Sequence, residues 1–322
     1  MVNTRVNLGG LEMATPVATA SGTFGYGTEY AGAVDYSRLG AVTAKGIRLK
    51  AWPGNGMPRH CEVPGGLVNA IGLQGAGVEQ FVKVSVPWYT SCLADFTPAP
   101  PPIIVNIWGG SIEEYAEVAR RLTEAAATAE CRAIGAVECN VSCPNVKEGG
   151  HTFGQDPSVL NRLVSAVRAA TTLPLFVKLS PNVPDMRPYV EACEDGGADA
   201  LSMINTIPAM VIDVERMESV LANVTGGLSG RCVHPVAVKA VYDARKVTKL
   251  PILAMGGVYE AKDAIEFILA GATAVAVGTA TFSDPSTAGR VCDGIVDWCE
   301  RHGFGSVSDA SGALKVPGGE VR

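Results

Sequence analysis

The sequence predicts a (β/α)8 barrel in which residues 1–322 form a single domain. Three observations indicate this fold: eight short apolar segments recur, helical patterns separate many of them, and polar residues gather where the segments end. With 47% hydrophobic and 18% charged residues, the chain has the composition of a globular protein with a large core. A doubly wound parallel sheet is the alternative arrangement of the same elements.

The eight candidate strands are rich in β-branched or small apolar residues and are bounded by Gly, Pro or Asn. They are residues 16–20, 41–45, 102–108, 136–142, 174–179, 200–205, 251–256 and 274–279.

Helical patterns lie between many of these strands. Ser111 and Glu114 have the spacing of a capping box at the start of residues 111–130. Asp156 and Pro157 open a helix over 156–171. Its apolar face consists of Val159, Leu163, Val164 and Val167. Further helices are expected over 234–248, 260–272 and 285–303.

Residues 47–101 do not follow the alternation, because they contain glycine-rich stretches and the proline run TPAPPP. We expect this insertion to lie over the mouth of the barrel, at the carboxyl ends of the strands, where such enzymes bind substrate.

Composition also excludes several classes of function. The net charge is −6 without a cluster of Lys or Arg, which argues against nucleic acid as a partner. We expect a cytoplasmic protein without a membrane span, because the chain shows neither a signal-peptide core nor about 20 consecutive apolar residues. Cys139 and Cys143 form an isolated pair, so we expect no metal site. The GTFGYG stretch lacks the glycine order of a dinucleotide-binding motif.

Polar residues, or glycines, collect at the predicted carboxyl ends of all eight strands. They are Ser21, Lys45, Asn106, Asn140, Cys143, Lys178, Asn205, Thr206, Gly256, Gly257, Gly278 and Thr279. Lysines inside apolar segments require an anionic partner. Glycines followed by helices after the last two strands are typical of a phosphate site in a barrel. Together these features predict a phosphorylated cofactor.

The chain resembles the class 1 dihydroorotate dehydrogenases, the FMN enzymes of pyrimidine synthesis. The resemblance is carried by ATASGTFGYGTEY, NAIGLQ, NVSCPNVKEGGHTFG, VKLSPN, GGLSG, AMGG and AVGTATFSDP, which run over nearly the whole length. The segment GGLSGRCVHPVAVKAVYDARK is similar to the type 1B catalytic subunit, whose partner carries FAD and an iron–sulfur cluster.

The resemblance implies roles for individual residues. FMN-binding positions are Ser21, Lys45, Gly46, Asn106, Asn140, Lys178, Ile204, Gly230, Gly256, Gly257, Gly278 and Thr279. Positions for dihydroorotate or orotate are Lys45, Asn69, Ala70, Ile71, Gly72, Leu73, Asn140, Asn145, Asn205 and Thr206. Cys143 matches the catalytic base, on a loop that closes over the substrate. The family also implies a homodimer core within a heterotetramer and electron transfer through the partner to NAD.

The sequence departs from the type 1B pattern at a few positions, among them Gly75-Ala76, Trp108 and Pro208. Other functions therefore stay open at this point: an FMN barrel acting on another dihydropyrimidine or cyclic imide, or a type 1A enzyme that uses fumarate. A flavin-free barrel, such as a sugar-phosphate isomerase or lyase, is the alternative from another class.

Overall fold

A closed barrel of eight parallel strands forms the centre of the protein. The computed structural model describes residues 2–97, 99–142, 153–317 and 319–320. The barrel strands are β3 (Val17–Thr19), β4 (Val42–Ile47), β7 (Ile103–Ile107), β8 (Ile134–Asn140), β9 (Leu175–Leu179), β10 (Ala200–Met203), β15 (Ile252–Met255) and β16 (Ala274–Val277). Their order is β3-β16-β15-β10-β9-β8-β7-β4, and the parallel bridge between Ala18 and Ala41 closes the ring. The predicted barrel is confirmed, and each strand lies on one of the predicted segments.

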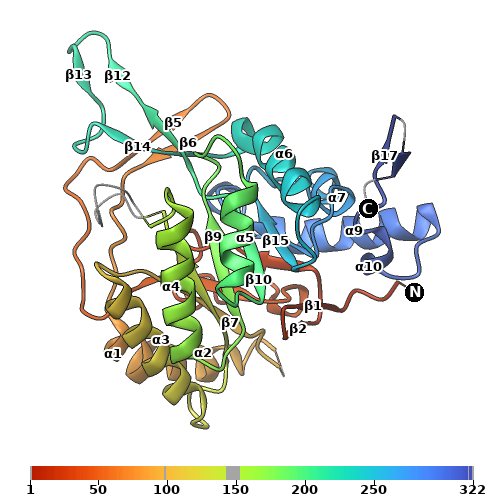
Figure 1. The fold of residues 1–322 in the computed structure, drawn as a ribbon, viewed down its shortest axis with the longest axis horizontal. Helices are drawn as coiled ribbons and strands as arrows, with labels where there is room; N and C mark the ends of the chain where they lie inside the picture. The colour runs from red at the N-terminus through yellow and green to blue at the C-terminus, as the bar shows by residue number, and fades with distance from the viewer. Residues whose placement is uncertain (1, 98, 143–152, 318, 321–322) are drawn as a thin grey trace.

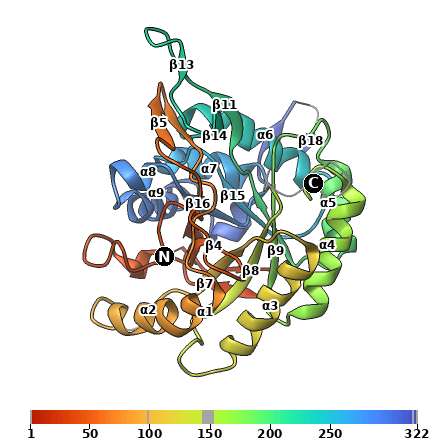
Figure 2. The same cartoon turned by 90° about the vertical axis from the view of Figure 1, so that its left-hand side faces the viewer.

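Helices surround the strands on the outside (Figures 1 and 2). The longer ones are α2 (Val86–Leu93), α3 (Ile112–Ala126), α4 (Pro157–Ala170), α5 (Arg187–Asp195), α6 (His234–Arg245), α7 (Ala261–Leu269) and α9 (Thr287–His302). The short ones are α1 (Val78–Gln80), α8 (Ala280–Ser283), α10 (Val307–Ala310), the 3-10 turns Tyr36–Arg38 and Arg231–Val233, and the π-turn Phe81–Ser85. The predicted apolar face of α4 is buried. The sequence did not predict α5.

The start of α3 differs in detail from the capping box that the sequence predicted. Ser111 accepts the N–H of Glu114, as expected for an N-cap. The Glu114 carboxylate, however, accepts from Gly110 N and forms two hydrogen bonds with Arg48, each 2.9 Å long. A guanidinium that can bind both carboxylate oxygens competes with the single N–H of the cap residue, so only half of the box forms.

The amino end of the barrel is closed by apolar side chains. The hairpin of β1 (Val6–Leu8) and β2 (Leu11–Met13) packs Leu8 and Met13 into one cluster with Ala136, Phe176 and other barrel residues. This apolar cluster closes the end of the barrel opposite the cavity.

A four-stranded antiparallel sheet lies at that carboxyl end. Its order is β11-β14-β6-β5, from β5 (His60–Val63), β6 (Gly66–Asn69), β11 (Ile207–Met210) and β14 (Thr225–Ser229). Between β11 and β14, the hairpin of β12 (Ile212–Asp213) and β13 (Glu218–Ser219) projects from the molecule (Figure 1). A last pair, β17 (Lys315–Val316) and β18 (Gly319–Glu320), lies near the C-terminus. The sequence did not predict the contribution of 207–229 to this region.

The segment 47–101 has two parts with different positions. Residues up to Gly77 contribute β5 and β6 to the sheet over the mouth, as expected. From Val78 onward the chain instead forms α1, the π-turn and α2, which bury Phe81, Tyr89 and Leu93 in the outer core. This second part supplies the helical layer between β4 and β7. No helix among the described residues is long and apolar enough to cross a membrane.

Candidate active site

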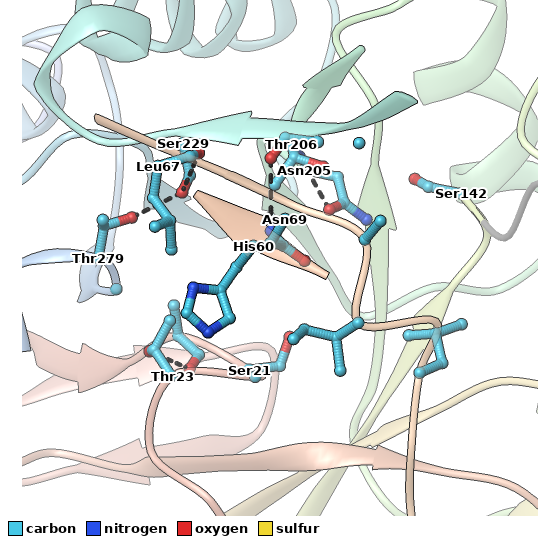
Figure 3. A pocket seen from close by; sticks show the side chains of 18 of the residues that line it. Ser21, Thr23, His60, Leu67, Asn69, Ser142, Asn205, Thr206, Ser229 and Thr279 are labelled. Atoms are coloured by element: carbon cyan, nitrogen blue, oxygen red, sulfur yellow. Dashed lines mark hydrogen bonds between the residues drawn. The ribbon is translucent and has the colours of Figure 1, made fainter. Parts of the chain in front are cut away.

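A cavity of about 1150 Å³ opens at the carboxyl end of the barrel, beneath the antiparallel sheet (Figure 3). Among the described residues, every one that the sequence predicted for cofactor or substrate lines it. They are Ser21, Lys45, Gly46, Asn69, Ala70, Ile71, Gly72, Leu73, Asn106, Asn140, Lys178, Ile204, Asn205, Thr206, Gly230, Gly256, Gly257, Gly278 and Thr279. Cys143 and Asn145 lie outside the described residues. Ser142, directly before the segment 143–152, and Gly154, the second residue after it, both line the cavity.

Two residues of opposite charge are buried at the cavity: Lys178, which lines it, and Glu138, which does not. Glu138 and Lys178 stand on the neighbouring strands β8 and β9, and are 0% and 5% exposed. Lys178 Nζ donates to Ser21 Oγ at 3.0 Å, and Asn106 Nδ2 donates to Glu138 Oε1 at 2.6 Å. Burial lowers the pKa of Lys178, and the negative charge of Glu138 opposes that shift. The second carboxylate oxygen, Oε2, has no hydrogen-bond partner among the described residues.

The sequence analysis missed Glu138, although an acidic residue within the apolar run AVECN was a usable signal. Its pairing with Asn106 depends on the register of β7 against β8, which places the two residues side by side. The sequence does not give that register.

Side-chain amides converge on one wall of the cavity. Asn205 Nδ2 donates to Asn140 Oδ1 at 3.0 Å, and Asn205 Oδ1 accepts from Thr206 N at 2.8 Å. Tyr115 Oη anchors the end of β8 by donating to Asn140 O at 2.6 Å. Because an amide offers both a donor and an acceptor, this wall suits a ligand with alternating N–H and C=O groups.

The loop after β6 presents its backbone to the cavity. Asn55 holds it, since Asn55 Nδ2 donates to Ala70 O at 2.9 Å and Asn55 N donates to Ile71 O at 3.0 Å. Gly72 and Leu73 have φ values of 75° and 58°, in the left-handed region. Leu73 is not a glycine, and such backbone outliers concentrate at functional sites.

Four glycines form a second backbone surface in the cavity, which we call the glycine cradle: Gly230, Gly256, Gly257 and Gly278. The first three have φ values of 109°, 133° and 72°. A Cβ at Gly230 would lie 2.5 Å from Gly66 Cα, and one at Gly257 would lie 2.8 Å from Gly230 O. The chain therefore requires glycine here, and bare backbone with free N–H groups is what a phosphate needs. The residues present fit a phosphorylated cofactor.

The end of the GTFGYG stretch, beside the cavity, donates its N–H groups to a carboxylate of the same loop. The Glu29 carboxylate accepts from Tyr26 N, Gly27 N and Thr28 N at 2.9 to 3.1 Å. An anion-binding turn that is filled by its own carboxylate does not hold a nucleotide phosphate. No group of three His, Cys, Asp or Glu side chains suited to a metal ion occurs in the described part of the chain.

Basic residues from β4 and from the insertion lie on another side of the cavity. Burial and the nearby Arg59 lower the pKa of Lys45, while Glu29 acts in the other direction. Arg59 Nη2 donates to Gln74 Oε1 at 2.7 Å, and His60 points from β5 toward Ser21 and Thr23 (Figure 3). The sequence analysis missed Arg59 and His60, because they lie in an insertion without periodic pattern.

Comparison with known proteins connects this geometry to a family. Residues 3–298 match the family described as dihydroorotate dehydrogenase. The chain is 49% identical to the dihydroorotate dehydrogenase B (NAD(+)) catalytic subunit of Pelobacter propionicus, over 96% of this chain and 98% of that protein. It is 47% identical to the protein of the same name from Geobacter sp. (strain M21), over 97% and 98%. It is 45% identical to that of Lachnoclostridium phytofermentans, over 98% of this chain and all of that protein. The match therefore covers the barrel, the antiparallel sheet and the cavity between them, and this chain belongs to the dihydroorotate dehydrogenase family.

Proposed function

We propose that this protein oxidises dihydroorotate to orotate in pyrimidine biosynthesis, with FMN as its bound cofactor. The observation that carries the proposal is the composition of one cavity. It combines convergent amides, two lysines and the glycine cradle in a chain whose relatives are named dihydroorotate dehydrogenases.

The cofactor would lie between the glycine cradle and the amide wall. Its phosphate would be held by backbone N–H groups and a hydroxyl, those of Gly230, Gly256, Gly257, Gly278 and Thr279. The ring would contact Ser21, Lys45, Gly46, Asn106, Asn140, Lys178 and Ile204. When bound, FMN accepts the hydride that leaves C6 of dihydroorotate. The chain contributes the positive charge of Lys178, which favours negative charge at the neighbouring ligand.

The substrate would lie against the amide wall. The imide edge of the substrate would find hydrogen-bond donors and acceptors in side-chain amides, a hydroxyl and the backbone of one loop. These belong to Asn69, Asn140, Asn145, Asn205, Thr206 and Ala70–Leu73. Lys45 would attract the carboxylate. The resemblance assigns Cys143 as the base that removes the proton from C5. In the sequence Cys143 follows Ser142, which lines the cavity.

The electrons would leave through a partner. The relatives are named catalytic subunits of an NAD(+) enzyme, and a name of that kind implies a second subunit. We propose that the partner carries FAD and an iron–sulfur cluster and that two copies of this chain form the core of a heterotetramer. The cytoplasm is the expected location.

Spectroscopy on the purified chain tests the function. Loaded with FMN and kept anaerobic, it should lose the 450 nm flavin absorption on addition of dihydroorotate, and orotate should shift the spectrum of the oxidised protein. Dihydrouracil, which lacks the carboxylate, is the comparison substrate. Bleaching by dihydrouracil and not by dihydroorotate would favour another dihydropyrimidine. A chain that takes up no FMN would point to a flavin-free barrel.

A further inference from the structure

We propose that His234, the first residue of α6, is a positioning residue that fixes the Gly256–Gly257 turn so that this turn can bind the phosphate of the cofactor. The inference rests on the proposed FMN function and adds to it a residue that does not itself touch the ligand. His234 does not line the cavity.

The imidazole holds a backbone carbonyl of the turn. His234 Nδ1 lies 2.8 Å from Gly256 O. A carbonyl oxygen can only accept, so Nδ1 carries the hydrogen and donates it. The residue is 9% exposed, and its ring packs edge-on against Phe267 with a centroid distance of 5.0 Å. Packing against this ring limits the rotation of the imidazole.

The hydrogen bond also sets the direction of the next N–H. In a trans peptide the C=O and N–H groups point in opposite directions. Since Gly256 O points toward α6, the N–H of Gly257 is turned away from α6. Gly257 N donates no hydrogen bond to a residue that the structure describes. Because both glycines line the cavity, this N–H is left for a ligand.

The turn packs closely against the start of α6, without room for side chains at the two glycines. A Cβ at Gly257 would lie 2.7 Å from His234 Cβ, and one at Gly256 would lie 2.8 Å from Ala237 Cβ. The first turn of α6 thus contacts the glycine cradle directly. The other imidazole nitrogen, Nε2, is 3.3 Å from Glu266 Oε2 but lacks hydrogen-bond geometry. The hydrogen bond from Nδ1 to Gly256 O is therefore the contact by which His234 positions the turn.

Two substitutions distinguish the roles of the two imidazole nitrogens of His234. In His234→Asn the amide Nδ2 can occupy the place of Nδ1 and keep the donor to Gly256 O. In His234→Gln the amide Nε2 falls nearer the place of the imidazole Nε2, so that donor is lost. His302 provides the matched control, because its Nδ1 also lies 2.8 Å from a backbone carbonyl, that of Trp298, but on the exposed surface of α9.

The experiment measures the dissociation constants of FMN and of riboflavin, which lacks the phosphate, by fluorescence titration of the FMN-free chain. We expect His234→Gln to weaken FMN binding about tenfold, the effect of losing one positioning hydrogen bond, and to leave riboflavin binding unchanged. His234→Asn should stay within about threefold of wild type on the same grounds. His302→Gln should change neither constant.

Other results would overturn the inference. Equal weakening of FMN and riboflavin in His234→Gln would mean a general structural role, and unchanged FMN binding would mean no role. If His234→Gln does not fold, His234→Asn tests the inference instead. Its thermal midpoint shows whether it is folded, and a folded Asn variant with weakened FMN binding would contradict the role of Nδ1. A wild-type chain that binds no FMN would instead refute the proposed function itself.

Discussion

Glu138 and Lys178 form an unusual pair for the interior of a barrel, because both charges are buried and no direct hydrogen bond joins them among the described contacts. Removing one partner of a buried pair leaves the other charge uncompensated. The effect should be visible in the titration of the lysine.

We expect Glu138→Gln to make Lys178 lose its proton at a lower pH than in the wild type. The substitution keeps the shape of the side chain but removes the charge that opposes the lowering of the lysine pKa by burial. The midpoint potential of FMN on the loaded protein falls with pH in every variant, because flavin reduction takes up protons, but it should fall more steeply where Lys178 becomes neutral. That steeper fall should start at lower pH in Glu138→Gln and be absent in Lys178→Met. If the steeper fall starts at the same pH in the wild type and in Glu138→Gln, Glu138 and Lys178 do not interact.

Cys143 is the second residue whose role can be tested alone. Cys143→Ala should bind FMN and orotate as the wild type does, yet its flavin should be reduced by dihydroorotate about 10²–10⁴ times more slowly, the usual loss for a general base. Stopped-flow measurement of flavin absorption checks this. Cys92→Ala, on α2 in the outer layer, is the control and should keep the wild-type rate. Unchanged reduction in Cys143→Ala would remove it from the mechanism.

At the scale of elements, the sequence predicted the barrel because strands buried on both faces read as apolar runs. All five residues of β7 and of β9 are buried, for example. The sheet over the mouth lacked such a signal. The strand β14, TGGLS, contains two glycines and is only partly buried, since the cavity lies on one side of it. The helix α5 was missed because its nine residues bury only Tyr189, Val190, Ala192 and Cys193 between charged positions.

The contact between Arg48 and Glu114 joins the end of β4 to α3 and gives a prediction at this scale. Burial raises the pKa of Glu114, but the hydrogen bonds from Arg48 and Gly110 outweigh it, so the pKa lies below the ordinary 4.5. The ionised form is therefore favoured in the folded state. Its contribution to stability is present above pH 4.5 and is lost as pH falls through the lowered pKa.

We expect Glu114→Gln to lower the free energy of unfolding of the FMN-free chain by about 1 kcal/mol at pH 7, since the site is partly exposed and solvent screens the pair. The difference from wild type should shrink below pH 4.5, where the unfolded carboxylate takes up its proton. Urea unfolding at several pH values measures this. Glu191→Gln, exposed on α5, is the control and should show no such difference. A difference that stays constant with pH would mean that packing, and not charge, is lost.

At the scale of the whole molecule, the cavity joins segments from both ends of the chain, from Ser21 to Thr279. The sequence predicted that the residues at the strand ends meet there, because the carboxyl ends of parallel strands share one edge. The loop Asn69–Leu73 and Gly230 were predicted only through the family resemblance. It did not predict the contacts that support them, such as His234 with Gly256 or Asn55 with Ala70, because these depend on how the helices and the insertion pack.

The last prediction concerns the path of the electrons. The chain should reduce its FMN with dihydroorotate but turn over poorly with NAD until an electron-transfer subunit is added. This follows from the proposed type 1B organisation and from the GTFGYG stretch, which lacks the glycine order of a dinucleotide-binding motif and donates Tyr26 N and Gly27 N to Glu29. Steady-state assays with NAD, with fumarate, and with NAD plus the flavin–iron–sulfur subunit of a related enzyme separate the possibilities. Stimulation of NAD turnover by the added subunit supports the proposal. Rapid fumarate-dependent turnover, unaffected by any partner, would assign the chain to the type 1A organisation instead.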